Sequence, residues 1–252
     1  MITKAAFVFL GGWFAGGIIN YFADQLPRKG QLTRPVYPPC LAPLQLYRWL
    51  VQKRTLSRGC AGASRRIRRH IVVELAAILL LAGLRLTLVS GMQFWLLVLL
   101  ISCFGLIMVI DLEHKLILNA VVAPTVTVAL SYGTLGMHRG WTETVGGGIA
   151  GYGLMYLMFL AGKVFVRIAE QRNDTVIIGT ALGGGDIILA GIIGLAAGWP
   201  GVLAALMYGV CAAGFGALIM RLRRDYRSFT VMPYGLFLVS GAAMFLWLQA
   251  SA

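Results

Sequence analysis

Residues 94–111 read FWLLVLLISCFGLIMVID, an unbroken apolar run that ends in an aspartate. About 20 mainly apolar residues are needed for a helix to cross the hydrocarbon core of a bilayer, so this run predicts a membrane-spanning helix over 93–112. Ionised groups are costly at such positions and are functional more often than not. The stretch therefore predicts a membrane fold and one candidate functional residue, Asp111.

The composition of the whole chain extends this prediction. Of the 252 residues, 59% are hydrophobic and 12% are charged, and the mean hydropathy is +0.81, well outside the range of soluble globular proteins. We expect an all-α, polytopic membrane bundle of about eight transmembrane helices. The apolar runs place them near residues 5–23, 71–90, 93–112, 117–135, 143–166, 184–198, 201–220 and 232–249.

The basic residues predict how the chain is oriented. It carries 22 Lys and Arg and a net charge of +13, and all but Lys4, Arg85 and Arg139 fall on one set of connections. These connections are residues 24–70, 113–116, 167–183 and 221–231, with Lys163 at the edge of its helix. The positive-inside rule places them in the cytoplasm and both termini outside. We therefore divide the chain into a first transmembrane helix (1–23), a basic cytoplasmic loop (24–70) and a seven-helix core (71–252).

The basic loop is expected to lie against anionic lipid headgroups. No nucleic-acid motif accompanies its charge, so we expect membrane lipid and not nucleic acid as its partner. Its two cysteines, Cys40 and Cys60, do not form a disulfide framework with Cys103 and Cys211, because the latter two lie within apolar runs. We therefore expect the loop to lie in the reducing environment of the cytosol.

A second carboxylate lies at the same predicted depth as Asp111. Residues 181–199 read ALGGGDIILAGIIGLAAGW, and the orientation places Asp186 at the cytoplasmic end of its helix. Two such aspartates suit hydrolysis of a peptide bond without a metal, because one takes a proton from water while the other, kept protonated, polarises the carbonyl oxygen. The pair would share one proton. The glycines before Asp186 would let a substrate backbone come close.

Simpler interpretations of both aspartates stay open on these grounds alone. Asp186 is also suited to be the N-cap of its helix, and Asp111 to be a solvated loop acid. The second account is the weaker one, because the macrodipole at a helix C-terminus disfavours an anion. Glycines four residues apart predict close helix packing without chemistry: Gly12 and Gly16, Gly147 and Gly151, and Gly194 and Gly198.

Four motifs, in this order and spacing, resemble those of the type IV prepilin peptidases, membrane aspartic proteases of the GxGD class. DLEHKLILN (111–119) and GGGDIIL (183–189) resemble the two aspartate motifs, except that Leu118 replaces a proline and Ile188 a lysine. GGWFAGGIINYFADQLP (11–27) resembles the N-terminal motif, with Gln25 where arginine is usual. MPYGLFL (232–238) resembles the family's P-F-G-P-F-L segment.

The resemblance implies that Asp111 and Asp186 are the catalytic pair. Five residues fall on motif positions that would support them: Gly183, Gly185, Asn119, Pro233 and Gly235. The implied substrate is a prepilin or pseudopilin of a type IV pilus or type II secretion system. Its short basic leader would be cut after a glycine at the cytoplasmic face of the bacterial inner membrane, just ahead of an apolar helix.

Many members of this family also carry two C-x-x-C pairs in the first cytoplasmic loop and methylate the new N-terminus with S-adenosylmethionine. Each pair keeps one cysteine here, Cys40 and Cys60, and His70 is the only histidine in or beside the loop. A structural zinc takes four ligands, so we expect no zinc. The peptidase itself needs no cofactor. Methylation stays open, since the resemblance links Asn20 and Glu74 to it.

Three other interpretations remain. The first is a carrier whose acids relay protons, although no inverted repeat is evident and the acids cluster at one face. The second is an intramembrane protease of the presenilin type, which shares the glycine-aspartate motif but not the DLEHKLILN segment or the loop after the first helix. The third is a catalytically degenerate relative that only binds pilin subunits, given the missing lysine, arginine and proline.

Overall fold

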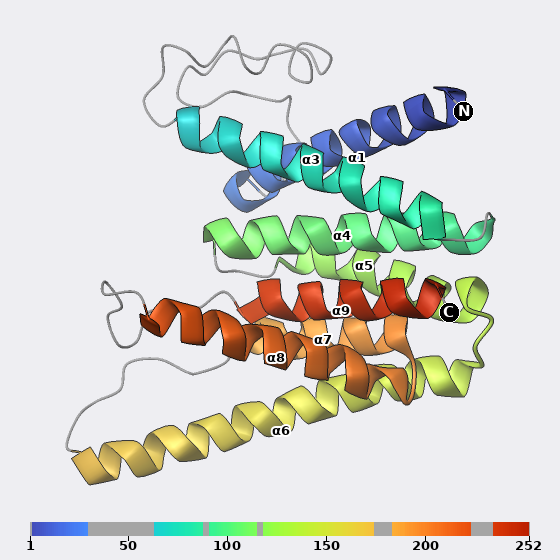
Figure 1. Ribbon diagram of the computed structural model, residues 1–252. Helices are drawn as coiled ribbons and strands as arrows, with labels where there is room; N and C mark the ends of the chain where they lie inside the picture. Colours follow the sequence, from blue (N-terminus) through green and yellow to red (C-terminus); the bar gives the residue numbers. More distant parts are fainter. Residues whose placement is uncertain are drawn as a thin grey trace. The chain divides into compact units, whose positions relative to one another are not determined.

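The computed structural model describes residues 2–29, 63–87, 91–114, 118–173, 183–222 and 234–251. All of the regular elements in these segments are helices, and eight of them are α-helices at the places that the apolar runs predict. The all-α prediction is confirmed for this part of the chain. The helices fall into two compact units, residues 1–89 and 90–252, which we describe separately (Figure 1).

The first unit contains α1 (Ile2–Lys29) and α3 (Ala63–Thr87). Glycines of α1 allow the two helices to approach closely, as their spacing predicts: a Cβ on Gly12 would lie 2.5 Å from Cα of Ile78, and one on Gly16 would lie 2.7 Å from Cα of Glu74. Both helices extend beyond the predicted apolar spans. Residues 24–29 and 63–70 are helical, although they were expected in the basic loop.

Side chains of α1 and α3 explain this extension. The Asp24 carboxylate accepts a hydrogen bond from Nη2 of Arg69 at 2.6 Å and lies 3.2 Å from Nε2 of His70. Asn20 donates from Nδ2 to the backbone carbonyl of His70 at 3.3 Å. These contacts join the two helices at the ends of their apolar parts, and both helices continue beyond them. The other residues of the loop, 30–62, lie outside the described residues, and the division of the chain at residue 70 stays a prediction.

The second unit is built around a short central helix. Its elements are α4 (Met92–His114), α5 (Asn119–Ser131), the π-helical turn η1 (Tyr132–Gly136), α6 (Trp141–Asn173), α7 (Gly184–Ala197), α8 (Gly201–Leu222) and α9 (Tyr234–Ser251). Helix α7 contacts α5, α6, α8 and α9. Its buried face is almost wholly apolar, with Leu189, Ala190 and Ala196 fully inaccessible to solvent. The unit therefore has its core around α7 (Figure 1).

Glycine contacts hold α6 against α7. A Cβ on Gly147 would lie 2.5 Å from the carbonyl oxygen of Gly194. A Cβ on Gly151 would likewise clash with the carbonyl oxygen of Ala190. The predicted role of these small residues in close packing is confirmed. Because higher numbers on α6 meet lower numbers on α7, the two helices run antiparallel.

Three described helices are long and apolar enough to cross a membrane. They cover Met92–His114, Trp141–Val164 and Gly201–Ile219. Gly184–Ala197 and Tyr234–Gln249 are shorter apolar helices. The 14 residues of α7 extend about 21 Å, less than the roughly 30 Å of a hydrocarbon core. The protein is thus a helical membrane protein with a short helix at the centre of its second unit.

Candidate active site

Asp111 lies in the last turn of α4, which ends at His114. Its exposed fraction is 7%, so it is not the solvated loop acid that one alternative assumed. The helix continues past Asp111 while the three residues after it, Leu112, Glu113 and His114, are exposed. Asp111 is therefore the last buried residue of α4.

Asp186 lies in the first turn of α7. It is not the N-cap, as the alternative assumed: Gly183 takes that position and Asp186 is the third residue of the helix. Its Oδ2 accepts a hydrogen bond from the backbone N–H of Gly183 at 3.1 Å. An acid in the first turn satisfies one of the free N–H groups there and interacts favourably with the macrodipole. Its carboxyl group is nevertheless buried, with an exposed fraction of 9%.

The structure brings these two carboxyl groups together. Asp111 and Asp186 are 75 residues apart in sequence, yet their carboxyl groups are close enough to interact electrostatically. The start of α9 closes the site: Gly235 lies against the Asp111 carboxyl, and the Tyr234 hydroxyl group interacts with Asp186. Three helix ends thus form one buried acidic site. At Gly184 an added Cβ would meet no atom of the described residues within 4 Å.

The far end of α7 is also fixed by a polar contact. Nη1 of Arg139 donates a hydrogen bond to the backbone carbonyl of Ala196 at 2.9 Å. A cation there satisfies a free carbonyl and complements the macrodipole, as the carboxylate does at the other end. The position of Asp186 along the helix axis is therefore held from both ends of α7.

The other predicted support residues differ in their placement. Gly183 and Gly235 lie in the site, and Gly185 is half-buried beside Asp186. Asn119 is the exposed first residue of α5, and no described contact joins it to either aspartate. Pro233 lies outside the described residues.

Asn20 and Glu74 belong to the first unit, where both are buried between α1 and α3. Gly16 lies against the backbone of Glu74, and Asn20 contacts the His70 carbonyl. Cys40 and Cys60 lie outside the described residues, so the expectation on zinc stays a prediction.

Sequence reasoning missed one residue of the site, Tyr234, and one that holds the far end of α7, Arg139. Tyr234 was read only as part of the MPYGLFL segment, in which a hydroxyl group stands at a position where the resembling family has phenylalanine. That departure was the available signal. Arg139 was counted as a charge in an outer connection, and nothing in the local sequence indicates that it reaches the end of α7.

The fold and this site define a helical membrane protein with paired buried aspartates at adjoining helix ends. Residues 97–218 match the sequence model of the type IV leader peptidase family. This segment is therefore of the prepilin-peptidase type, and the match indicates that the protein is a protease. The matched segment contains both aspartates and all of α7. The match confirms the resemblance to this family through the two aspartate motifs, 111–119 and 183–189, while the motifs at 11–27 and 232–238 lie outside the matched residues. No curated protein and no solved structure matches the chain.

Proposed function

We propose that this protein is a membrane aspartic endopeptidase that removes the basic leader from prepilin or pseudopilin precursors, with Asp111 and Asp186 as its catalytic pair. One observation carries the proposal: two aspartates on helices far apart in sequence are both buried and interact at one site. Burying two acids close enough to interact is costly, and such acids are retained where they have a function. The family match supports the leader-peptidase part of the proposal.

The pair supplies the groups that hydrolysis of a peptide bond requires. The ionised aspartate takes a proton from a water molecule, whose oxygen attacks the scissile carbonyl carbon. The protonated aspartate donates its proton to the carbonyl oxygen, which gives a tetrahedral diol. As the C–N bond breaks, the leaving nitrogen takes a proton from the first aspartate. The second aspartate takes back a proton from a hydroxyl group of the diol, which becomes the new carboxyl group. The reaction consumes one water and needs no metal.

The helix ends assign different roles to the two acids. Asp186 lies at the N-terminus of α7, where the macrodipole and the Gly183 N–H stabilise a negative charge. Asp111 lies near the C-terminus of α4, where a negative charge gains no such support. In the proposed mechanism Asp186 is the base that activates water, and Asp111 holds the shared proton.

The proposed arrangement in the membrane follows the positive-inside rule. The chain would cross the bacterial inner membrane eight times, with both termini outside and the ends of α4 and α7 that carry the aspartates at the cytoplasmic face. The basic leader of a precursor would reach the site from that side. Its apolar helix would stay in the bilayer, so the scissile bond would lie at the boundary where the two aspartates are.

N-methylation with S-adenosylmethionine remains a separate prediction. The residues that the family resemblance links to it do not fit a cofactor of this size in the described part of the chain. The side chains of Asn20 and Glu74 are 0% and 5% exposed and lie within the contact between α1 and α3. We therefore derive no step from this cofactor.

Replacing each aspartate tests the proposal. Asp111→Asn and Asp186→Asn should each abolish cleavage of a co-expressed prepilin, scored by the size and the N-terminal mass of the pilin. The proteins should still reach the membrane in normal amounts. Glu113→Gln is the matched control, since this carboxylate is on the same turn of α4 but exposed, and it should leave cleavage intact. Full cleavage by either Asp→Asn variant would contradict the assigned pair.

If the wild-type protein itself binds prepilin without cleaving it, the protein is the degenerate relative and not the peptidase. Ion flux in proteoliposomes without cleavage would identify the proton-coupled carrier instead.

A further inference from the structure

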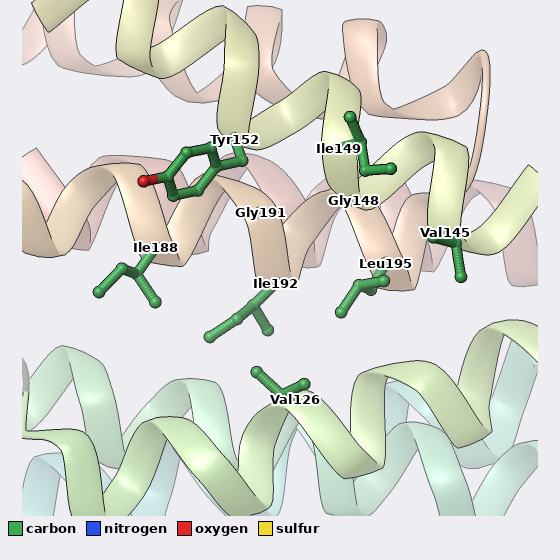
Figure 2. A pocket seen from close by; sticks show the side chains of 9 residues that line it. All are labelled: Val126, Val145, Gly148, Ile149, Tyr152, Ile188, Gly191, Ile192 and Leu195. Carbon is green, nitrogen blue, oxygen red and sulfur yellow. The ribbon is translucent and has the colours of Figure 1, made fainter.

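The contact between α6 and α7 fixes which of their residues lie at the same level. Small residues let the two helices lie side by side (Figure 2), and the glycine contact nearest to the active site joins Gly151 of α6 to the carbonyl group of Ala190 of α7. The helices are antiparallel and both rise about 1.5 Å per residue, so a step along α6 matches a step back along α7. Asp186 is four residues before Ala190, and it therefore lies level with Met155, four residues after Gly151.

The apolar part of α6 continues past the level of the aspartate. No charged residue follows Met155 until Lys163, whose Nζ lies over the ring of Phe159. Leu157 and Leu160, which lie in between, have exposed fractions of 63% and 39%, as expected of side chains that face hydrocarbon. Phe159 is four residues and Lys163 eight residues after Met155, so α6 stays apolar for about 6–12 Å beyond the level of Asp186.

Helix α7 begins at this apolar level, although its first turn is unsuited to hydrocarbon. Gly183 and Gly184 are exposed, and neither has a side chain to cover the backbone. The first N–H groups of a helix have no partner within the helix, and lipid chains offer no acceptor for them. The Asp186 carboxylate accepts from one N–H group, that of Gly183. Water or another polar group must therefore reach the start of α7, at the level where Leu157 of α6 is exposed.

The end of α4 is also polar close to the catalytic pair. Glu113 and His114 are both exposed, and they follow Asp111 within about 5 Å along the helix. The Asp111 carboxyl group is close enough to Asp186 to interact with it, so these polar side chains lie near the level of the pair. The polar boundary thus comes close to the aspartates at α4 and at the start of α7, whereas at α6 it lies at least one helical turn further away.

We propose that the two aspartates act in a hydrated notch, between the end of α4 and the first turn of α7, that descends about 6–12 Å below the level at which α6 leaves the apolar layer. The inference rests on the proposed function, because it takes the site to hydrolyse a peptide bond. The notch supplies the water that the reaction consumes. It also defines the substrate as a precursor whose scissile bond is drawn below the membrane surface, where only the notch offers polar partners to an extended backbone.

Both alternatives to a notch carry a cost. If the level of the aspartates were the membrane surface, the exposed side chains of Leu157 and Leu160 would extend into water. If hydrocarbon closed around the aspartates, the exposed backbone of Gly184 would have no acceptor for its N–H group. A local descent of the polar boundary beside α7 suits both helices.

Cysteine labelling measures the depth of the notch. Single cysteines are placed in a chain without its native ones (Cys40→Ser, Cys60→Ser, Cys103→Ala and Cys211→Ala), and inverted membrane vesicles are treated with a charged maleimide. Gly184→Cys should react about 100-fold faster than Leu157→Cys, the matched control at the same level of α6, because a thiol in hydrocarbon does not ionise. Leu160→Cys should be protected as well, whereas Arg167→Cys, an exposed position past the apolar part of α6, should react. All four should react equally after denaturation.

Protection by substrate tests whether the scissile bond enters the notch. The labelling is repeated in the Asp111→Asn background, which retains uncut precursor, with and without co-expressed prepilin. Prepilin should slow the labelling of Gly184→Cys about tenfold, as mass action gives when about nine in ten sites are occupied. The labelling of Arg167→Cys should not change. This measurement does not require the cysteine variants to be active.

The outcomes separate the notch from the proposed function. Fast labelling of both Gly184→Cys and Leu157→Cys would place the site at the membrane surface and overturn the notch, and protection of both would overturn it by excluding water. Labelling of Gly184→Cys that prepilin does not slow would overturn the notch as the place where the bond is cut. If the wild-type protein does not cleave prepilin, the proposed function fails even where the labelling pattern holds, so the two failures are distinguishable.

Discussion

Gly235 lies directly against the carboxyl group of Asp111: a Cβ at residue 235 would be 2.8 Å from Oδ2 and 3.3 Å from Cγ. Real side chains do not tolerate the shorter distance, so the carboxyl group would have to move. Gly235 is in the first turn of α9, whereas Asp111 is in the last turn of α4. A glycine on a third helix thus fixes where one of the two acids lies.

Gly235→Ala should therefore reduce cleavage more than it affects folding. Displacing a catalytic group by about 1 Å can lower a rate by roughly 100-fold, and we expect a loss between about tenfold and 100-fold in kcat. The rate of prepilin cleavage in detergent measures it. Gly214→Ala is the control, because a Cβ on that α8 glycine meets no atom within 4 Å among the residues that the structure describes. A full rate for Gly235→Ala would show that Asp111 does not need this position.

Tyr234→Phe removes the hydroxyl group that interacts with Asp186. The hydroxyl group is close enough to Asp186 to act on it electrostatically, so kcat should fall about two- to tenfold while the protein stays folded. The pH dependence of kcat should also shift, because the hydroxyl group acts on an acid that exchanges protons in the reaction. Tyr208→Phe, at an exposed position of α8, should change neither quantity. An unshifted pH profile for Tyr234→Phe would count against a role near Asp186.

Arg139→Ala should lower stability. The side chain donates a hydrogen bond to the carbonyl of Ala196 in the last turn of α7, and its loss leaves a buried carbonyl without that donor. We expect a destabilisation of about 1–2 kcal/mol, measured as a lower thermal unfolding temperature in detergent. Arg167→Ala, on the exposed part of α6, should leave the unfolding temperature nearly unchanged. Equal effects of the two substitutions would mean that the contact with Ala196 does not stabilise α7.

The helices and their close contacts were predictable from sequence because the membrane limits the choices. Backbone groups in lipid must be satisfied internally, so each long apolar run becomes a helix. The pairs Gly12 and Gly16, and Gly147 and Gly151, then indicate which faces touch. The aspartates were found by the same logic, since an acid at the end of an apolar run is rare enough to be informative.

The ends of the helices and the third wall of the site were less predictable. Hydropathy predicts that the first helix ends near residue 23, yet α1 continues to Lys29. Within this extension Asp24 contacts Arg69 and His70 of α3. A contact between side chains 45 residues apart leaves no local pattern in the sequence. Tyr234 was missed for the same reason: its importance depends on where α9 meets α7. Charge pairs and single hydroxyl groups are set by the tertiary fold.

The contact of Asp24 with Arg69 and His70 predicts how stability varies with pH. Burial alone would raise the pKa of Asp24, but the hydrogen bond with His70 and the charge of Arg69 outweigh it, so the pKa lies below the ordinary value of 3.8. A carboxyl group whose pKa is lower in the folded state than in the unfolded state stabilises the fold at any pH above its unfolded-state pKa. This stabilisation is lost as the pH falls through the folded-state pKa. The contribution should therefore be full at pH 7 and fade below about pH 3.8.

Asp24→Asn should accordingly destabilise the protein by about 2 kcal/mol at pH 7, as expected for a part-buried hydrogen bond between charged groups. As pH falls below 3.8 the unfolding temperatures of the variant and the wild type should converge, because the wild-type carboxyl group becomes neutral as well. Arg69 and His70 remain in both proteins, so the difference isolates Asp24. Glu113→Gln, which changes an exposed carboxylate, should give only a small difference at either pH. A difference for Asp24→Asn that stays constant from pH 7 to pH 3 would mean that the charge of Asp24 does not hold α1 to α3.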